Sequence, residues 1–187
     1  MNVTPETWPR RHRLTVDEYY RMAEVGLLSP DARVELIEGE IIDMAPIGSR
    51  HASAVSLLTQ RLIRAVGDSA IVWSQSPVRL DVRSEPQPDL ALLRPRADHY
   101  AGGHPAPPDV LLIVEVSDTT LDYDRNVKAG LYARYGIPTL WIVDPAHGRL
   151  HTCQRPVDDG YRDLSVVDKT SVGIPGLSIE LDLTGLL

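Results

Sequence analysis

The 187-residue chain has a single cysteine, Cys153, and this scarcity excludes several kinds of site. One cysteine cannot form an intrachain disulfide or a cysteine-based zinc site, so a reducing cytoplasm is the expected location. No apolar run approaches the roughly 18 residues that span a bilayer. Residues 1–13 also lack the apolar segment of a secretory signal. We therefore expect a soluble protein that does not contact membranes.

Positive charge is also scarce, since 19 Lys and Arg stand against 26 Asp and Glu and give a net charge of −7. Proteins that bind nucleic acid usually carry a basic face, so this balance counts against such a partner. The objection is incomplete, because a nuclease that holds divalent cations gathers carboxylates that the bound metal offsets. Basic residues do cluster at 10–13 and at Arg61 and Arg64, although a solvated tail and a solvated helix face explain these clusters more simply.

Internal repeats, low-complexity segments and the glycine patterns of dinucleotide-binding and P-loop proteins are absent as well. The length fits one domain over residues 14–187, preceded by a flexible N-terminal tail over residues 1–13. Helix-like and strand-like apolar patterns are interspersed along the chain. This order predicts an α/β fold in which a mixed β-sheet is flanked by helices.

Three helices are expected. Thr15 and Glu18 have the spacing of a capping box, which predicts a short helix that ends near residue 25. Ser49 is the expected N-cap of a second helix over about 50–66, whose inward stripe includes His51. The third helix is expected near residues 124–135.

Several strands are expected between and after these helices. The first two are joined by a tight turn at Glu38-Gly39. The segment 94–108 is rich in proline and glycine and is expected to be a loop. The strands are predicted at residues 34–37, 40–44, 70–74, 78–82, 90–93, 110–116, 140–143 and 149–154, with further short strands in the remainder.

Glu115 lies near the end of a predicted strand whose other residues, from Val110 to Val116, are all aliphatic. Such a strand is covered on both faces, and a buried, unpaired carboxylate there costs several kcal/mol or becomes protonated. Glu115 should therefore face a cation or a hydrogen-bond donor, unless it lies just beyond the covered region and meets water.

Asp89 stands at the beginning of the predicted strand 90–93. If this strand and the strand 110–116 are antiparallel neighbours, Asp89 and Glu115 meet at one edge of the sheet. Two carboxylates there can bind a hard cation such as Mg²⁺. The alternative for Asp89 is an ordinary turn aspartate that follows a proline.

Lys128 falls in the early turns of the third helix and can reach back to the strand end that carries Glu115. The alternative is a surface ion pair between Lys128 and Asp124, which are four residues apart on one helix face. Tyr132 continues the face of Lys128 and is expected to pack against the same site.

The ordered set of Pro88-Asp89 and Glu115-Val116-Ser117 resembles the signature of PD-(D/E)xK nucleases. The chain as a whole, from about Leu14 to the last strands, resembles a bacterial family of restriction-endonuclease-like proteins. The segments that carry this resemblance are 35–41, 88–89, 114–117, 124–128 with Tyr132, and 136–145.

The resemblance implies a restriction-endonuclease-like fold and a metal-dependent nuclease. It implies that Asp89, Glu115 and the backbone carbonyl of Val116 hold the metal. Ser117 stands where the wider superfamily has lysine, and Lys128 is the residue that takes over its role. A carboxylate of the first hairpin is also implied, with Glu35 as first choice and Glu40 as second, while His51 is either a site residue or a packed core histidine.

The resulting hypothesis is an endonuclease that hydrolyses phosphodiester bonds with Mg²⁺, for which Mn²⁺ can substitute. Double-stranded DNA is the expected partner by analogy, and a homodimer suits the cutting of both strands. The main alternative is a non-catalytic binding or interaction module on a nuclease-like scaffold. A third possibility is an enzyme that acts on a small phosphorylated metabolite.

Overall fold

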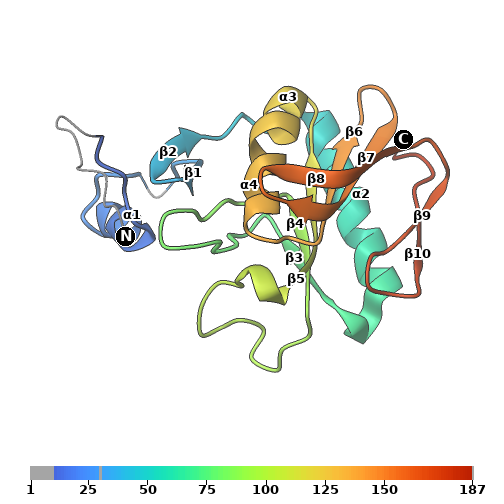
Figure 1. Cartoon of the computed structure of the whole chain (residues 1–187), viewed down its shortest axis with the longest axis horizontal. Helices are drawn as coiled ribbons and strands as arrows, with labels where there is room; N and C mark the ends of the chain where they lie inside the picture. The colour runs from blue at the N-terminus through green and yellow to red at the C-terminus, as the bar shows by residue number, and fades with distance from the viewer. Residues whose placement is uncertain (1–10, 30, 187) are drawn as a thin grey trace.

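The computed structural model describes residues 11–29 and 31–186, and its elements alternate between helices and strands (Figure 1). The first half contains α1 (Val16–Glu24), β1 (Val34–Ile37), β2 (Glu40–Asp43), α2 (Ser49–Val66), the 3₁₀ helix η1 (Gly67–Ser69), β3 (Ile71–Ser74) and β4 (Leu90–Leu93). The second half contains the 3₁₀ helix η2 (Pro107–Asp109), β5 (Val110–Val116), α3 (Leu121–Tyr123), the π-helical segment η3 (Asp124–Lys128), α4 (Ala129–Arg134), β6 (Thr139–Asp144), β7 (Arg149–Val157), β8 (Gly160–Val167), β9 (Ser171–Gly173) and β10 (Glu180–Asp182).

A six-stranded mixed sheet forms the centre, in the order β3-β4-β5-β6-β7-β8. β5 and β6 are parallel, and all other neighbours in this sheet are antiparallel. The parallel pair requires a crossover, which α3, η3 and α4 supply. The predicted α/β architecture, a mixed sheet flanked by helices, is therefore confirmed.

Two apolar layers cover the two faces of this sheet. Alternate residues of β5 enter different layers, because successive side chains of a strand point to opposite faces. Leu112 and Val114 pack with α2 and the β9–β10 pair, whereas Ile113 packs with α4. The parity of β5 consequently places Glu115 on the same face as Ile113, toward α4.

The β1–β2 hairpin and α1 lie together at one end of the molecule, away from β9 and β10 (Figure 1). The turn Glu38-Gly39 has positive φ at both residues, of 50° and 77°, as a tight two-residue hairpin turn requires. A Cβ at Gly39 would lie 2.8 Å from Cβ of Arg13 and 2.9 Å from the backbone of Leu14. Glycine is thus required here both for its φ and for the close approach of the preceding chain.

The predicted helices are confirmed with shifted ends. Thr15 and Glu18 form the expected capping box of α1. The N-cap of α2 is Gly48 and not Ser49, which is already the first helical residue. The third helix begins at Leu121, three residues before the predicted start, because α3 and η3 run directly into α4.

The predicted strand at 78–82 is wrong. Its apolar residues Val78 and Leu80 are buried, as the alternation suggested. Their backbone N–H groups, however, donate to the carbonyls of Pro86 and Ser84 in the same loop. The segment therefore folds back on itself. Its side chains alternate between buried and less buried positions, but its backbone does not pair with a strand of the sheet.

Residues 1–10 of the predicted flexible tail lie outside the described residues, and the predicted domain boundary stays a prediction. Arg13, at the end of that tail, contacts the first hairpin through the carboxylate of Glu40 at 2.6 Å and the carbonyl of Glu38 at 3.2 Å. Across the described residues, no helix is long and apolar enough to cross a membrane.

Candidate active site

Glu115 is a buried carboxylate on the central strand, with 3% of its surface exposed. It lies one residue before the end of β5, on the face covered by η3 and α4. Its Oε1 accepts hydrogen bonds from Tyr132 Oη at 2.7 Å and Lys128 Nζ at 3.1 Å. The expectation that Glu115 faces a cation and a donor is therefore confirmed, and so is the packing of Tyr132 against this site.

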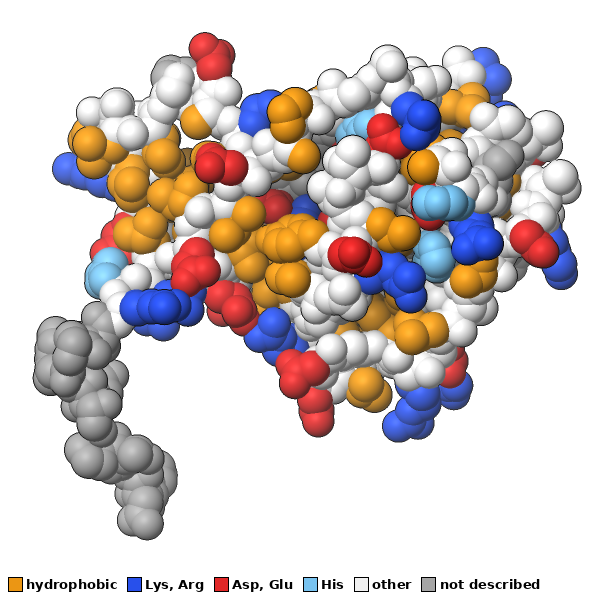
Figure 2. Space-filling model, turned by 90° about the horizontal axis from the view of Figure 1, so that it is seen from above, with side chains coloured by type: hydrophobic (Ala, Val, Ile, Leu, Met, Phe, Trp, Pro, Cys, Tyr) orange, Lys and Arg blue, Asp and Glu red, His pale blue; other side chains and the backbone are white. Residues whose placement is uncertain are grey.

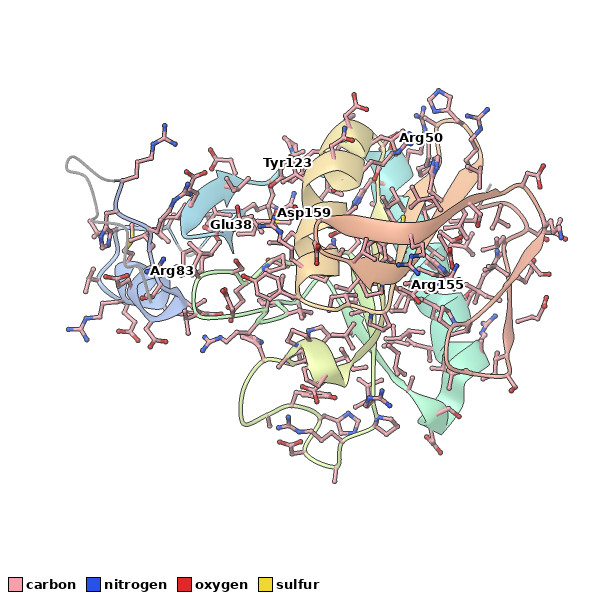
Figure 3. All side chains as sticks on the ribbon, viewed as in Figure 1. Glu38, Arg50, Arg83, Tyr123, Arg155 and Asp159 are labelled. Atoms are coloured by element: carbon pink, nitrogen blue, oxygen red, sulfur yellow. The ribbon has the colours of Figure 1, made fainter. Side chains whose placement is uncertain are left out.

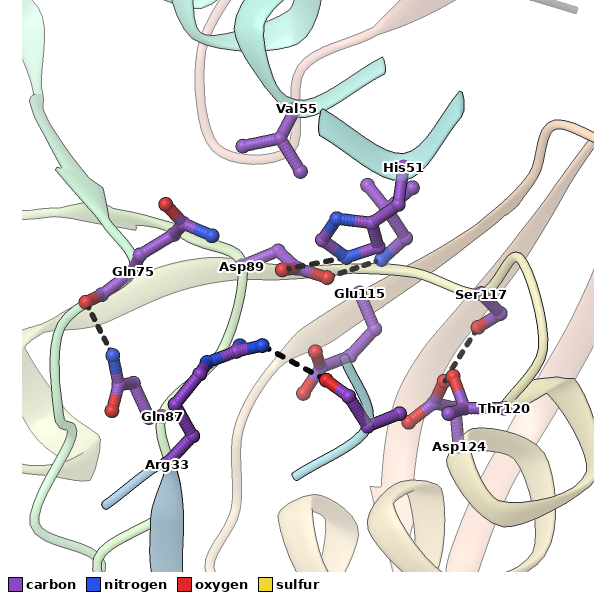
Figure 4. A network of polar contacts seen from close by, with 12 residues as sticks. Arg33, His51, Val55, Gln75, Gln87, Asp89, Glu115, Ser117, Thr120 and Asp124 are labelled. Carbon is purple, nitrogen blue, oxygen red and sulfur yellow. Dashed lines mark hydrogen bonds and ion pairs between the residues drawn. The ribbon is translucent and has the colours of Figure 1, made fainter. Parts of the chain in front are cut away.

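Asp89 lies beside the end of β5, as the antiparallel pairing of β4 and β5 predicted. The backbone N–H of Val116 donates to Asp89 Oδ2 at 2.8 Å. His51 Nε2, from the first turn of α2, contacts Asp89 Oδ1 at 3.0 Å (Figure 4). His51 thus lines the cleft and contacts Asp89, which is held by β5 and α2 together.

Lys128 is the cation of the site and is nearly enclosed, with 5% of its surface exposed. Its Nζ lies 3.1 Å from Glu115 Oε1 and 3.3 Å from Glu35 Oε2. The alternative of a surface ion pair between Lys128 and Asp124 is wrong, because both side chains are buried and bind different partners.

Glu35 is the carboxylate that the first hairpin contributes, and it is buried. Besides Lys128, its Oε2 accepts a hydrogen bond from the backbone N–H of Gln87 at 3.0 Å. Glu40 is exposed and pairs with Arg13. The structure therefore brings the first choice, Glu35, to the site and leaves Glu40 outside it.

Asp124 is a buried carboxylate that sequence reasoning assigned only to the helix surface. Its Oδ2 accepts hydrogen bonds from the hydroxyls of Ser117 and Thr120, each at 2.6 Å (Figure 4). Ser117 thus secures the start of η3, the segment that carries Lys128. The hydroxyls just after β5 were the sequence signal that could have revealed this contact.

These residues surround a cleft of about 180 Å³ between the first hairpin, the start of α2 and η3. Its walls carry both carboxylates and backbone groups that a polar ligand could meet. The lining includes Glu35, Asp89, Glu115, Val116, Asp124, Lys128, His51, Arg33, Asp118 and Tyr123.

The pKa of Glu115 is raised to about 8. Burial raises it most, the charge of Lys128 opposes this, and the neighbouring carboxylates Asp124, Asp89 and Glu35 add to the rise. Burial alone would lower the pKa of Lys128, but Glu115 and Glu35 raise it well above its usual value. Lys128 therefore stays charged whichever form Glu115 takes, because a second carboxylate holds it.

The hydrogen bond to Asp89 raises the pKa of His51, against the lowering effect of burial. Burial and the charge of Glu115 raise the pKa of Tyr132 well above its usual value. Tyr132 therefore remains a neutral donor to Glu115 at any physiological pH.

The oxygen ligands of the cleft bear on whether it can hold a divalent cation. Among the described residues, no three His, Cys, Asp or Glu side chains converge as a preformed metal site. Two carboxylates, Asp89 and Glu115, do meet at the cleft. Within the described part of the chain, Oε2 of Glu115 has no hydrogen-bond partner, so this oxygen is available to a cation. The set suits Mg²⁺, which keeps several waters and takes few ligands from the protein.

Comparison with known proteins identifies the family. The sequence profile of the Uma2 family, described as "Putative restriction endonuclease", matches residues 16–184. The chain belongs to the Uma2 family. This match covers nearly all of the sequence, from α1 to the residues after β10, and it includes every residue of the cleft. Uma2 membership agrees with the resemblance to restriction-endonuclease-like proteins and places the chain in a nuclease-like family.

A solved structure shows the same fold. It is a protein of Anabaena variabilis ATCC 29413, described as "a putative nuclease belonging to DUF820". The two chains are 17% identical and superpose with a TM-score of 0.66, over 92% of this chain and 97% of the other. No curated protein sequence matches the chain.

Proposed function

We propose that this Uma2 chain is a Mg²⁺-dependent endonuclease that hydrolyses phosphodiester bonds in double-stranded DNA. The observation that supports it best is the convergence of Asp89, Glu115 and Lys128 on one cleft. Asp89 directly precedes β4, Glu115 belongs to β5 and Lys128 to η3. Two carboxylates beside a buried cation have the components that metal-assisted hydrolysis needs.

Asp89, Glu115 and the backbone carbonyl of Val116 are the ligands proposed for Mg²⁺, with Mn²⁺ as a substitute. A divalent cation there would supply a water of lowered pKa and neutralise charge on the phosphate. The contact of His51 with Asp89 Oδ1 and the N–H of Val116 on Oδ2 fix the orientation of that carboxylate. Preorganised ligands of this kind do not have to be reoriented when substrate arrives.

Lys128 is proposed to stabilise the negative charge that develops on the reacting phosphate. It is suited to this role because Glu35 and Glu115 hold Nζ at 3.3 and 3.1 Å and keep it charged. Lys128 lines the cleft although little of it is exposed, so its charge acts at short range in a poorly solvated site. Glu35 orients Lys128, and the hydroxyl of Tyr132 donates a hydrogen bond to Glu115 Oε1.

The choice of DNA as substrate rests on family membership and not on surface charge. On the face shown in Figure 2, acidic and basic side chains are interspersed, and the described residues form no continuous basic stripe there. Phosphate binding is therefore assigned to the cleft, where the metal would supply the missing positive charge. A cytoplasmic homodimer completes the proposal.

A non-catalytic binding module is the second candidate, and one observation favours it. Each charged group of the site is already engaged by another, Lys128 by two carboxylates and Asp89 by His51. Such a neutralised cluster is also what a purely structural polar core would contain.

Cleavage assays separate the two candidates. Plasmid DNA, single-stranded DNA and RNA are incubated with the full chain in Mg²⁺, in Mn²⁺ and in EDTA. The proposal predicts metal-dependent cutting of duplex DNA, which Glu115→Gln and Asp89→Asn reduce by about 100-fold or more. Glu24→Gln, at an exposed carboxylate of α1, is the matched control and should cut like the wild type. Absence of cutting on all substrates with both metals would leave the binding module as the better account.

A further inference from the structure

The outer edge of β8 is an unpaired sheet edge that carries apolar side chains. β8 ends the six-stranded order, so one side of its backbone has no strand partner among residues 11–29 and 31–186. Leu164 is 70% exposed and Val166 is 55% exposed, both on one face of the strand. An eight-residue edge with exposed apolar residues invites pairing with another chain, and native proteins usually protect such edges.

The apolar face of β8 is only partly covered by its own chain. Leu164 and Val166 line a second cavity of about 530 Å³, together with Ile142, Cys153 and Arg125. A Cβ at Gly130 would lie 3.1 Å from the carbonyl oxygen of Asp159, so α4 approaches the turn between β7 and β8 closely. Farther along β8, Leu164 and Val166 remain exposed. Figure 3 labels Arg155 and Asp159 on this hairpin.

The hydrogen bonds of the sheet show which backbone groups of β8 point outward. The N–H of Ser117 donates to the carbonyl of Val143, so Val143 faces β5 and the next residue back, Ile142, faces β7. By the same alternation His151, opposite Ile142, faces β6, and Thr152 faces β8, where it lies opposite Ser165. The N–H and C=O groups of Ser165 therefore face β7, and those of Leu164 and Val166 face away from it.

The face of β8 between residues 162 and 168 is self-complementary. It presents, at every second position, Arg162, Leu164, Val166 and Asp168, all of them exposed. Among the described residues neither Arg162 nor Asp168 forms an ion pair, whereas Arg155 and Asp163 pair with each other across the hairpin. When a second copy of this strand lies antiparallel to the first, the basic residue of each copy lies opposite the acidic residue of the other, and the apolar residues lie opposite each other.

We propose that two copies of the chain associate through β8, antiparallel and centred on Ser165. In this register Ser165 lies opposite Ser165 of the partner subunit, and the outward backbone groups of Leu164 bond with those of Val166 of the partner subunit. Leu164 lies opposite Val166 of the partner subunit, and Arg162 lies opposite Asp168 of the partner subunit. The apolar pair and the charged pair each occur twice, as an isologous two-fold interface requires.

Neighbouring registers lack this match. A shift of two residues in one direction sets Leu164 against Asp168 of the partner subunit. The opposite shift sets Arg162 against Val166 of the partner subunit. Each cross-strand pair of opposite charges or apolar side chains stabilises a sheet modestly, so the centred register is favoured by four such pairs. The inference does not depend on whether the cleft cleaves DNA.

Charge reversal tests the interface with the full chain, by sedimentation equilibrium over a range of concentrations. The wild type should form a dimer of twice the 20.7 kDa of one chain. Arg162→Asp and Asp168→Arg should each weaken it on the order of tenfold or more, because two attractive pairs become repulsive. The double variant R162D/D168R should restore the dimer, and an equimolar mixture of the two single variants should form a mixed dimer.

A second pair of variants tests the apolar contacts. Leu164→Asp should dissociate the dimer, whereas Val82→Asp, at a valine of similar exposure (69%), should leave it intact. Circular dichroism of each variant should match the wild type, since all the substituted residues are exposed. A wild type that remains monomeric, a dimer indifferent to Leu164→Asp, or a double charge reversal that fails to restore association would each overturn the proposal.

Discussion

Replacement of Lys128 by methionine removes the one cation of the buried cluster while it keeps the length of the side chain. The ammonium lies 3.1 Å from Glu115 and 3.3 Å from Glu35, and all three side chains are at most 7% exposed. Loss of one member of a buried ion pair costs about 3–5 kcal/mol, because the remaining charge is left without compensation. Here two carboxylates lose their partner, so we expect a destabilisation in that range at pH 8.

A loss of this size is readily measured. In a domain of this length, 1 kcal/mol corresponds to about 2–4 °C in melting temperature, so Lys128→Met should melt roughly 6–20 °C below the wild type. The loss should be smaller at pH 5, because protonation of the stranded carboxylates relieves the burial of charge. Urea denaturation at both pH values provides the free energies of unfolding.

Lys169 is the other lysine of the chain and is exposed, which makes Lys169→Met the matched control. Its effect should stay within about 0.5 kcal/mol, as is usual for surface substitutions. If Lys128→Met were no less stable than Lys169→Met at pH 8, the charge cluster described for the cleft would not exist in solution.

Three further predictions follow from burial and backbone geometry. The pKa of Glu115 is raised to about 8 in the folded protein. Its contribution to metal-free stability is therefore full below its unfolded-state pKa and is lost as the pH rises through 8. Glu115→Gln should flatten the fall in stability between pH 6 and 9, measured by urea denaturation, and an unchanged slope would contradict the assignment. Burial raises the pKa of the Cys153 thiol to about 11, so the native protein should react with a thiol reagent at pH 8 on the order of 100-fold more slowly than the urea-unfolded chain, and equal rates would refute its burial. Gly39→Ala should lower the melting temperature more than Gly26→Ala does. Both positions have positive φ, but only a Cβ at Gly39 meets neighbouring atoms at 2.8–2.9 Å. Equal losses of melting temperature would show that the contact with Arg13 is not tight.

The sequence predicted the parts of the fold that depend on local pattern and on burial of whole strands. The capping box at Thr15 and Glu18 and the tight turn at Glu38-Gly39 are encoded by short-range chemistry, and both are present. Strand 78–82 was wrong because alternation reports which side chains are buried, and Val78 and Leu80 achieve burial through hydrogen bonds within their own loop. The apolar pattern alone does not distinguish a backbone that hydrogen-bonds to a neighbouring strand from one that hydrogen-bonds within its own loop.

The candidate site was predictable where the antiparallel pairing of β4 and β5 determines it. If the two strands are antiparallel neighbours, an acid at the end of one lies beside an acid at the start of the other. The strands do pair in this way, and Asp89 accepts a hydrogen bond from the N–H of Val116. The surroundings of Lys128 were not predictable, because η3 is π-helical: the N–H of Ala129 bonds to the carbonyl of Asp124, five residues back. This wider turn alters the helical phase from which the ion pair between Asp124 and Lys128 was inferred.

The contact of His51 with Asp89 and the contact of Gln87 with Glu35 join segments distant in sequence. Their partners depend on how α2 and the first hairpin are placed against the sheet. Tertiary placement of this kind leaves no periodic signal in one sequence.

The central claim is that Asp89 and Glu115 form a binding site for a divalent cation. Its most direct test is a crystal of the full chain soaked in Mn²⁺ and measured at a wavelength where manganese scatters anomalously. The account predicts an anomalous peak in the cleft, about 2.0–2.4 Å from oxygens of both carboxylates. A saturated crystal with no peak there, and with Lys128 still bound between Glu35 and Glu115, would contradict it.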